Sequence, residues 1–204
     1  MRCCDYEGKN IKKRPLKNSH HITSEEIQEE QKIITAAKKD IRKFGALYDR
    51  YYEGIFNFVY RRSDDEAVAA DLVSQTFLKA MQGLKKYEFR GLPFSAWLYR
   101  IASNEVNKHY RKGKRQQVFS LEEGRVLELM ESDGEGADEE QLAMAVQLLK
   151  ALPTDMMEVL ELRFFEEKSF KEIAYILDIS ESGAKMRTYR ALEKLKSSLK
   201  GKID

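Results

Sequence analysis

The sequence has few of the residues that mark exported, membrane-spanning or β-rich proteins. Its 204 residues include only two cysteines, the adjacent Cys3 and Cys4, which give no disulfide framework and fit a reducing cytoplasm. No apolar run approaches the roughly 18 residues of a membrane span. The first residues, MRCCDYEGKN, lack a hydrophobic signal core, so export is not expected. Three prolines and the absence of alternating apolar and polar runs of strand length predict an all-α protein.

Residue sets for catalysis or metal binding are also lacking. We find no Ser/His/Asp or Cys/His set and no glycine-rich phosphate loop. Cys3–Cys4 and His20–His21 are adjacent pairs, which are too close in sequence to chelate one tetrahedral zinc ion. The carboxylates of 64–66 are consecutive in a predicted turn and cannot converge on a substrate. We therefore expect no metal, no cofactor and no enzymatic activity.

The first half of the chain predicts packed helices. Residues 1–40 form an N-terminal extension, basic and expected to be disordered up to Thr23, with a helix from Ser24. Helical periodicity is strong from Phe44 to Arg62, where a second aromatic stripe predicts burial over more than half of the circumference. A polar break at 63–65 precedes a helix through Leu84. The side chains expected inward in the first of these helices are Phe44, Leu47, Tyr48, Tyr51, Ile55, Phe58 and Val59, with Tyr52, Phe56 and Tyr60 as the second stripe.

The segment 89–115, FRGLPFSAWLYRIASNEVNKHYRKGKR, combines a turn with a long amphipathic helix. Gly91 and Pro93 form the turn, and Ser95 is a predicted N-cap for a helix that starts near Ala96. Amides, cations and aromatics on one face suit a nucleic-acid strand, because cations hold phosphates, amides read base edges and rings stack on bases. An amphipathic core helix with a solvated charged face is the alternative. The polar arc contains Arg100, Ser103, Asn104, Asn107 and Arg111, with Lys108 at its border.

Residues 116–140 predict a flexible acidic linker between two domains, 41–115 and 141–204. Nine carboxylates stand against the single Arg125 over 122–140, and three glycines interrupt the segment. A short helix around 126–130 is compatible with its apolar residues. By itself this composition fits a solvated spacer.

The segment 169–195, SFKEIAYILDISESGAKMRTYRALEKL, predicts a helix-turn-helix. The first helix is expected to bury Phe170, Ile173, Ala174 and Leu177, and Ile179 fills the turn. Asp178 occupies the position where glycine is commonest, and Asp tolerates a positive φ better than most residues. A helical hairpin used only for protein contacts is the alternative. The second helix is expected to bury Ala184, Thr188, Ala191, Leu192, Leu195 and Leu199, and to expose Ser182, Lys185, Met186, Tyr189, Arg190 and Glu193.

Taken together, the segments from Ile41 to Leu199 resemble a bacterial RNA polymerase sigma factor of the extracytoplasmic-function (ECF) group. The resemblance rests on FGALYDRYYEGIFNFVYRR, ADLVSQTFLKAM, FRGLPFSAWLYRIASNEVNKHYRK and LPTDMMEVLELRFFEEKSFKEIAYILDISESGAKMRTYRALEKLK, in that order. It implies a sigma region 2-like domain over 41–115 and a sigma region 4-like domain over 141–204. It also implies that the protein binds core polymerase and directs promoter recognition, DNA melting and initiation.

The resemblance assigns roles to individual residues. Family members often have Gln and then an acidic residue where this chain has Ser74 and Gln75, and often Asp or Asn where it has Lys108. The turn 89–95 matches the pocket that holds a base extruded from the promoter. Contacts are implied for Asp71, Ser74, Gln75 and Met81 with the polymerase β′ clamp; for Arg90, Phe94, Asn104, Asn107, Lys108 and Arg111 with the −10 region; and for Ser182, Lys185, Met186, Arg187, Tyr189 and Arg190 with the −35 region.

The resemblance also implies partners. These are core RNA polymerase, through its β′ clamp and β subunit, and promoter DNA, with an anti-sigma factor as a further candidate. The N-terminal extension could hold another docking site, and a cytoplasmic location without membrane insertion is expected. In this family the linker threads polymerase channels that later hold nucleic acid. The runner-up function is a DNA-binding regulator that acts without entering polymerase.

Overall fold

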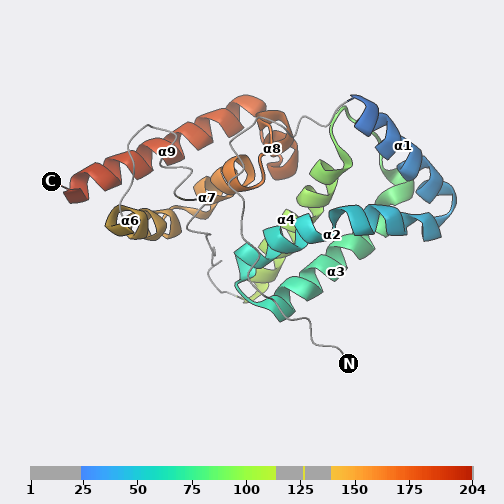
Figure 1. The fold of residues 1–204 in the computed structure, drawn as a ribbon, viewed down its shortest axis with the longest axis horizontal. Coiled ribbons are helices and arrows are strands. Elements are labelled where there is room, and N and C mark those ends of the chain that lie inside the picture. Colours follow the sequence, from blue (N-terminus) through green and yellow to red (C-terminus); the bar gives the residue numbers. More distant parts are fainter. Residues whose placement is uncertain (1–23, 114–125, 127–138, 204) are drawn as a thin grey trace.

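The structure is a computed structural model that describes residues 24–113, 126 and 139–203. Over these residues all regular secondary structure is helical, as the sequence predicts (Figure 1). The expected disorder before Thr23 and most of the predicted linker lie outside the described residues. In the first half the elements are α1 (Ser24–Lys39), η1 (Ile41–Phe44), α2 (Gly45–Ser63), α3 (Glu66–Gly83), η2 (Leu84–Lys86) and α4 (Phe94–Gly113).

The turn between α2 and α3 follows the predicted polar break. Asp64 ends α2 in the left-handed region at φ 50°, which Asp adopts more readily than most residues. The side chain of Asp65 then caps α3 by accepting a hydrogen bond from the backbone N–H of Val68 at 3.0 Å. This turn sends α3 back along α2, and both helices pack against α4.

The predicted burial of Tyr48 in the first stripe of α2, and of Tyr52 and Tyr60 in the second, is wrong, while Phe56 of the second stripe is partly buried against the core. The exposed fractions of the three tyrosines are 40%, 36% and 38%. The rings instead cover one another along the helix surface, because Phe56 stacks between Tyr52 and Tyr60 at centroid distances of 5.9 and 6.1 Å. Periodicity places these residues on one face but cannot say whether a neighbouring element covers that face.

Helix α1 belongs to the first core, although the sequence places it in the N-terminal extension. Ile34 and Ala37 are buried among residues of α2, α3 and α4. The buried carboxylate of Glu30 accepts hydrogen bonds from the Tyr51 hydroxyl and, at 2.9 Å, from the backbone N–H of Phe94, the first residue of α4. An anion at this position satisfies an N–H that has no partner within the helix and lies at the positive end of the helix dipole.

The second half forms its own core. Val126, a residue of the predicted linker, is fully buried there with Ala145, Leu149 and Leu160. Of the predicted linker, Val126 itself therefore packs with the second half. The elements are α6 (Glu139–Lys150), α7 (Thr154–Leu160), the π-helical turn η3 (Glu161–Phe165), α8 (Phe170–Leu177) and α9 (Glu181–Ile203).

The two halves are packed together through α4 and α8 (Figure 1). Val159, Ile173 and Ile176 of the second half are buried in the same apolar cluster as α4 residues such as Leu98 and Ala102. The sequence predicts two domains separated by a linker and gives no indication of this contact. This contact between the halves determines which parts of the candidate site are accessible.

Candidate DNA and polymerase interfaces

The recognition helix of the predicted helix-turn-helix lies at the surface. In α9, Ala184, Thr188 and Ala191 are buried on one face, as predicted, while Leu192 and Leu199 are only partly buried. The opposite face presents a mixed set of apolar and polar groups to solvent, and Met186 and Tyr189 are exposed by 53% and 65%. The predicted −35 residues that are exposed are Ser182, Lys185, Met186, Tyr189 and Arg190.

Local hydrogen bonds fix the orientation of this helix. Ser169 and Glu172 form a capping box at the start of α8. Asp178 adopts φ 57° in the turn, which is the left-handed conformation expected there. Ser180 then accepts a hydrogen bond from the backbone N–H of Gly183 at 3.0 Å, at the first turn of α9. The left-handed Asp178 that the sequence predicts is therefore present.

Arg187, the sixth predicted −35 residue, differs from the others. Its side chain is about one-third exposed, and its Nε lies 3.6 Å from a carboxylate oxygen of Asp155 in α7. In this structure Arg187 joins α9 to α7, so a phosphate would have to compete with Asp155 for it.

The loop before α4 forms the tight turn that the sequence predicts at Gly91. Gly91 has φ 68°, a conformation that L side chains rarely adopt. Arg90 is exposed on this loop. Phe94, in contrast, is fully buried against Tyr87 and Trp97, so its predicted contact with DNA is not available, and its role is to support the loop from below.

The polar face of α4 is divided between solvent and the second half of the chain. Three predicted −10 residues, Asn104, Lys108 and Arg111, are exposed. Asn107 is half-buried, and its amide donates to the carboxylate of Glu158 at 3.1 Å. Arg100 donates to the backbone carbonyl of Tyr175 at 2.8 Å and to Asp178 at 2.9 Å. The second half therefore covers part of the face expected to read the −10 strand.

A buried ion-pair network holds this contact. The guanidinium of Arg62, at the end of α2, is fully buried and lies 2.6 Å from Glu161 and 3.2 Å from Glu158. It also donates to the Ser103 hydroxyl of α4 at 3.3 Å. Burial raises the pKa of Glu161, and the neighbouring Arg62 and Arg61 oppose that rise.

A second group of polar contacts lies beside this network. Arg61 and the Tyr99 hydroxyl both donate to the Glu166 carboxylate. The Lys168 ammonium lies 4.3 Å from the centroid of the Tyr99 ring. Burial lowers the pKa of Lys168 and raises that of Tyr99. The contact between the halves is thus rich in charge, and its groups are held mainly by partners across the boundary.

Sequence reasoning missed the central residue of this network, although a signal was present. Arg62 follows Ile55, Phe58 and Val59 at helical spacing, so a cation continues the core-facing stripe of α2. A charge in such a position requires a buried partner. The partner was not identifiable, because Glu158 and Glu161 lie almost 100 residues further along the chain.

The candidate polymerase face on α3 is accessible. Asp71, Ser74 and Met81 are exposed, and Gln75 is half-buried. The Gln75 amide donates to the Asp71 carboxylate at 2.7 Å, which fixes both side chains on the outer surface. Leu78, on the same helix, is 53% exposed. This face therefore combines a polar pair with exposed apolar groups, as docking surfaces do.

The sequence matches known families and is similar to known proteins. Residues 47–116 match the family model for Sigma-70 region 2, and residues 148–197 match that for Sigma-70, region 4. The chain is 33% identical to the ECF RNA polymerase sigma factor BldN of Streptomyces coelicolor over 74% of its own length and 58% of BldN. It is 34% identical to the RNA polymerase sigma factor YlaC of Bacillus subtilis, over 75% of this chain and 90% of YlaC.

A solved structure has a similar fold. The sigma factor RpoE of Bartonella quintana, crystallised with the anti-sigma factor NepR, is 24% identical, with a TM-score of 0.54 over 78% of this chain and 98% of RpoE. The chain belongs to the ECF group of RNA polymerase sigma factors. None of the described helices has the length and apolar character needed to cross a membrane.

Proposed function

We propose that this protein is the promoter-specificity subunit of an RNA polymerase: it binds core polymerase, recognises promoter DNA, assists melting and leaves catalysis to the polymerase. The observation that carries the proposal is the exposed face of α9, where Lys185, Tyr189 and Arg190 project from a correctly capped helix-turn-helix. A surface of this kind, with cations and polar groups on a helix that can enter the major groove, is the usual reader of base pairs.

The other assignments follow from which side chains are accessible. On α3, Asp71, Ser74, Gln75 and Met81 contact the β′ clamp. On the loop and α4, Arg90 and the exposed residues Asn104, Lys108 and Arg111 contact the −10 strand. Arg187 contacts phosphate once it leaves Asp155. The two domains that carry these contacts are residues 41–115 and 141–204, and α1 packs on the first of them.

Reading of the −10 strand by the whole of α4 requires the two halves to separate. Asn107 is paired with Glu158, and Arg100 with Asp178, so both groups are occupied while the halves are packed together. Binding to core polymerase would supply the energy for separation if polymerase contacts each half in a different place. The closed arrangement is then the state of the free subunit.

An anti-sigma factor is a further candidate partner, because the RpoE relative was crystallised with one. A cytoplasmic location follows from the role. We assign no enzymatic activity, and no group of three His, Cys, Asp or Glu residues in the described part of the chain could hold a metal ion.

Run-off transcription tests the proposal. Core RNA polymerase is incubated with a library of promoter fragments in the presence and absence of the full chain, and transcripts are mapped. Specific initiation that appears only with the protein supports the proposal. Protein that binds the same fragments but adds no specific transcript would favour the runner-up, a DNA-binding regulator acting outside polymerase.

A further inference from the structure

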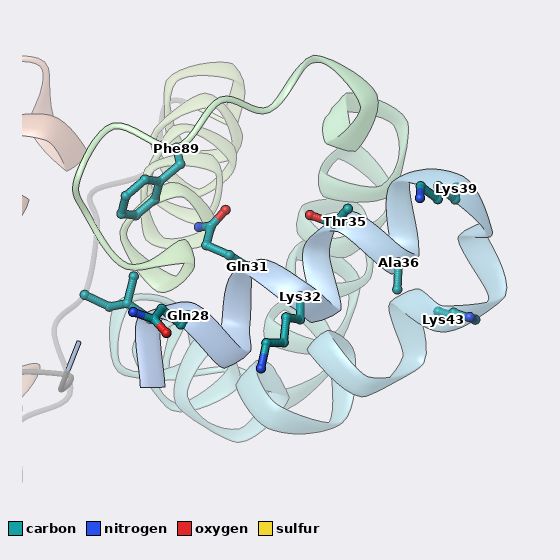
Figure 2. A pocket seen from close by; sticks show the side chains of 9 residues that line it. Gln28, Gln31, Lys32, Thr35, Ala36, Lys39, Lys43 and Phe89 are labelled. Atoms are coloured by element: carbon teal, nitrogen blue, oxygen red, sulfur yellow. The ribbon is translucent and has the colours of Figure 1, made fainter. Parts of the chain in front are cut away.

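A groove runs between the outer face of α1, which precedes the residues matched by the family model, and the loop that precedes α4 (Figure 2). Its volume is about 740 Å³, within the range of roughly 300–1,000 Å³ found for ligand sites. The loop side is formed by Phe89, whose ring is 45% exposed. The α1 and η1 side is formed by Ile27, Gln28, Gln31, Lys32, Thr35, Ala36, Lys39 and Lys43.

The charge of the groove has one sign. Lys32, Lys39 and Lys43 line it, and no carboxylate is among its lining residues. All three lysines are exposed. Three ammonium groups along one groove favour an anionic occupant with repeated charges.

The end of the groove near the loop contains groups suited to a base. The amide nitrogen of Gln31 is shielded from solvent and has no acceptor at full hydrogen-bonding geometry in the described part of the chain, and its nearest interaction is with the Tyr87 hydroxyl, whose pKa burial raises and this amide lowers. A primary amide has two N–H donors, so a ligand acceptor at this position would be stabilising even while the other donor faces Tyr87. Figure 2 shows the Gln31 amide next to the Phe89 ring, so one base could stack on the ring and accept from the amide.

The groove is held rigidly to the loop that we assign to the −10 pocket. Glu30 of α1 accepts from the backbone N–H of Phe94, and the Lys38 ammonium donates to the backbone carbonyl of Tyr87. These two bonds bracket the loop from 87 to 94. The exposed Arg90 is the residue next to Phe89. A strand leaving the −10 pocket would therefore enter the groove directly.

We propose that this groove binds the single DNA strand next to the extruded base, with one base on Phe89 and Gln31 and its phosphates along Lys32, Lys39 and Lys43. The proposal deepens the proposed function and rests on it for the identity of the strand. It assigns a nucleic-acid contact to α1, a helix that the sequence gives no role. None of the residues that line the groove belongs to α4 or α8, so the closed chain can bind the strand.

Fluorescence anisotropy with a labelled 15-nucleotide single strand of mixed sequence tests this at low salt with the full chain. Phe89→Ala should weaken binding at least about fivefold, the lower end for one stacked base. The triple variant Lys32→Ala, Lys39→Ala, Lys43→Ala should lower the slope of log affinity against log salt by about 2, at about 0.7 for each phosphate contact. The control, Lys150→Ala with Lys194→Ala and Lys196→Ala, removes three exposed lysines of the second half.

Gln31→Leu separates a ligand contact from a structural one. It should weaken binding of the single strand while changing the thermal midpoint little, because the internal interaction it removes is the incomplete one with the Tyr87 hydroxyl. A lower midpoint with unchanged binding would overturn the role of Gln31. Unchanged binding in all groove variants, or equal losses in the lysine control, would overturn the groove.

Failure of the groove proposal and failure of the proposed function give different results. Groove variants that bind the single strand normally, in a protein that still supports run-off transcription, reject the groove alone. A wild-type chain that gives no specific transcripts rejects the proposed function, whatever the groove binds. Poly-glutamate that displaces the strand, in a Phe89-dependent way and at equal charge concentration, would show that the occupant is an acidic peptide and overturn the DNA proposal.

Discussion

Arg62 and Glu161 form a buried ion pair at 2.6 Å that joins the end of α2 to the π-helical turn η3. The Arg62 side chain is fully buried, and that of Glu161 is exposed by only 1%. A guanidinium in such a place must be matched by carboxylates, since an unpaired buried charge is strongly destabilising. The pair therefore couples the folded position of one half to that of the other.

The first prediction concerns this coupling. The double variant Glu158→Gln, Glu161→Gln leaves Arg62 without either carboxylate that contacts it across the boundary. Loss of the partners of a buried charge costs about 3–5 kcal/mol, enough to favour separation of the halves. Fluorescence energy transfer between dyes at the exposed positions Asp49→Cys and Glu193→Cys, with Cys3 and Cys4 replaced by Ser, should show a longer distance in the variant.

A control distinguishes separation of the halves from general loss of stability. Glu105→Gln removes a buried carboxylate that pairs with Lys79 inside the first half. It should leave the transfer efficiency at the wild-type value. Equal efficiency in the double variant and the wild type, with both folded by circular dichroism, would mean that Arg62 does not hold the halves together.

The second prediction concerns pH. Burial raises the pKa of Glu161 in the closed arrangement above its ordinary value of 4.5, so closure favours its protonated form, and Arg62 then keeps the Glu158 carboxylate as its partner. Its contribution to closure is therefore complete below pH 4.5 and is lost as pH rises through the raised pKa. We expect the closed fraction to increase as pH falls from neutrality, and Glu161→Gln, with Glu158 still present, to flatten that dependence.

A closed fraction that decreases as pH falls would contradict this prediction. If ionised Glu161 is needed by Arg62, acid should open the chain, and the transfer efficiency would fall with pH. Measurement of the wild type and Glu161→Gln at the same pH values separates these outcomes from acid effects elsewhere in the chain.

Much of the fold could be predicted because its signals are local. The break at Asp64–Asp65, the glycine at 91 and the left-handed Asp178 each report on their own turn, and each has the expected conformation. The exposed face of α9 could be predicted for the same reason, since one helical stripe of small apolar residues defines the opposite face. These inferences need no knowledge of the rest of the chain.

The parts that could not be predicted depend on contacts between distant segments. Tyr52 is 36% exposed because only Phe77 of α3 and its own helix neighbours lie against its ring, and Phe94 lies inside because Glu30 and Tyr87 enclose the start of α4. Asn107 was predicted to contact DNA as a polar residue of α4, and in the structure its half-buried amide donates to Glu158. Helical periodicity predicts on which face of a helix a side chain lies. It does not predict which other segment packs against that face.

The third prediction concerns the α3 face. Asp71→Lys with Gln75→Lys should abolish co-elution with core polymerase while leaving helical content unchanged, because these side chains interact with each other on the outer surface. Glu29→Lys with Gln147→Lys makes the same change in charge at exposed positions outside this face and should retain binding. A double variant that still co-elutes with core would remove Asp71 and Gln75 from the interface.

The last prediction concerns −35 reading by Arg190. Its side chain is exposed on the face of α9 that also carries Lys185 and Tyr189, and no described acidic residue forms an ion pair with it. If it forms paired hydrogen bonds with a guanine, Arg190→Ala should cost about 1–3 kcal/mol on the preferred −35 sequence and little on a scrambled one. The preferred sequence is first recovered by selecting bound fragments from a random DNA pool, and both affinities are measured at one salt concentration.

Arg42→Ala provides the matched control, because Arg42 is an exposed arginine in η1, distant in sequence from the helix-turn-helix. It should leave both affinities near the wild-type values. Equal losses on the preferred and scrambled sequences in Arg190→Ala would assign Arg190 to a phosphate, since backbone contacts carry no direct sequence information. The salt slope should then fall by about 1 as well, whereas a base contact should leave it almost unchanged.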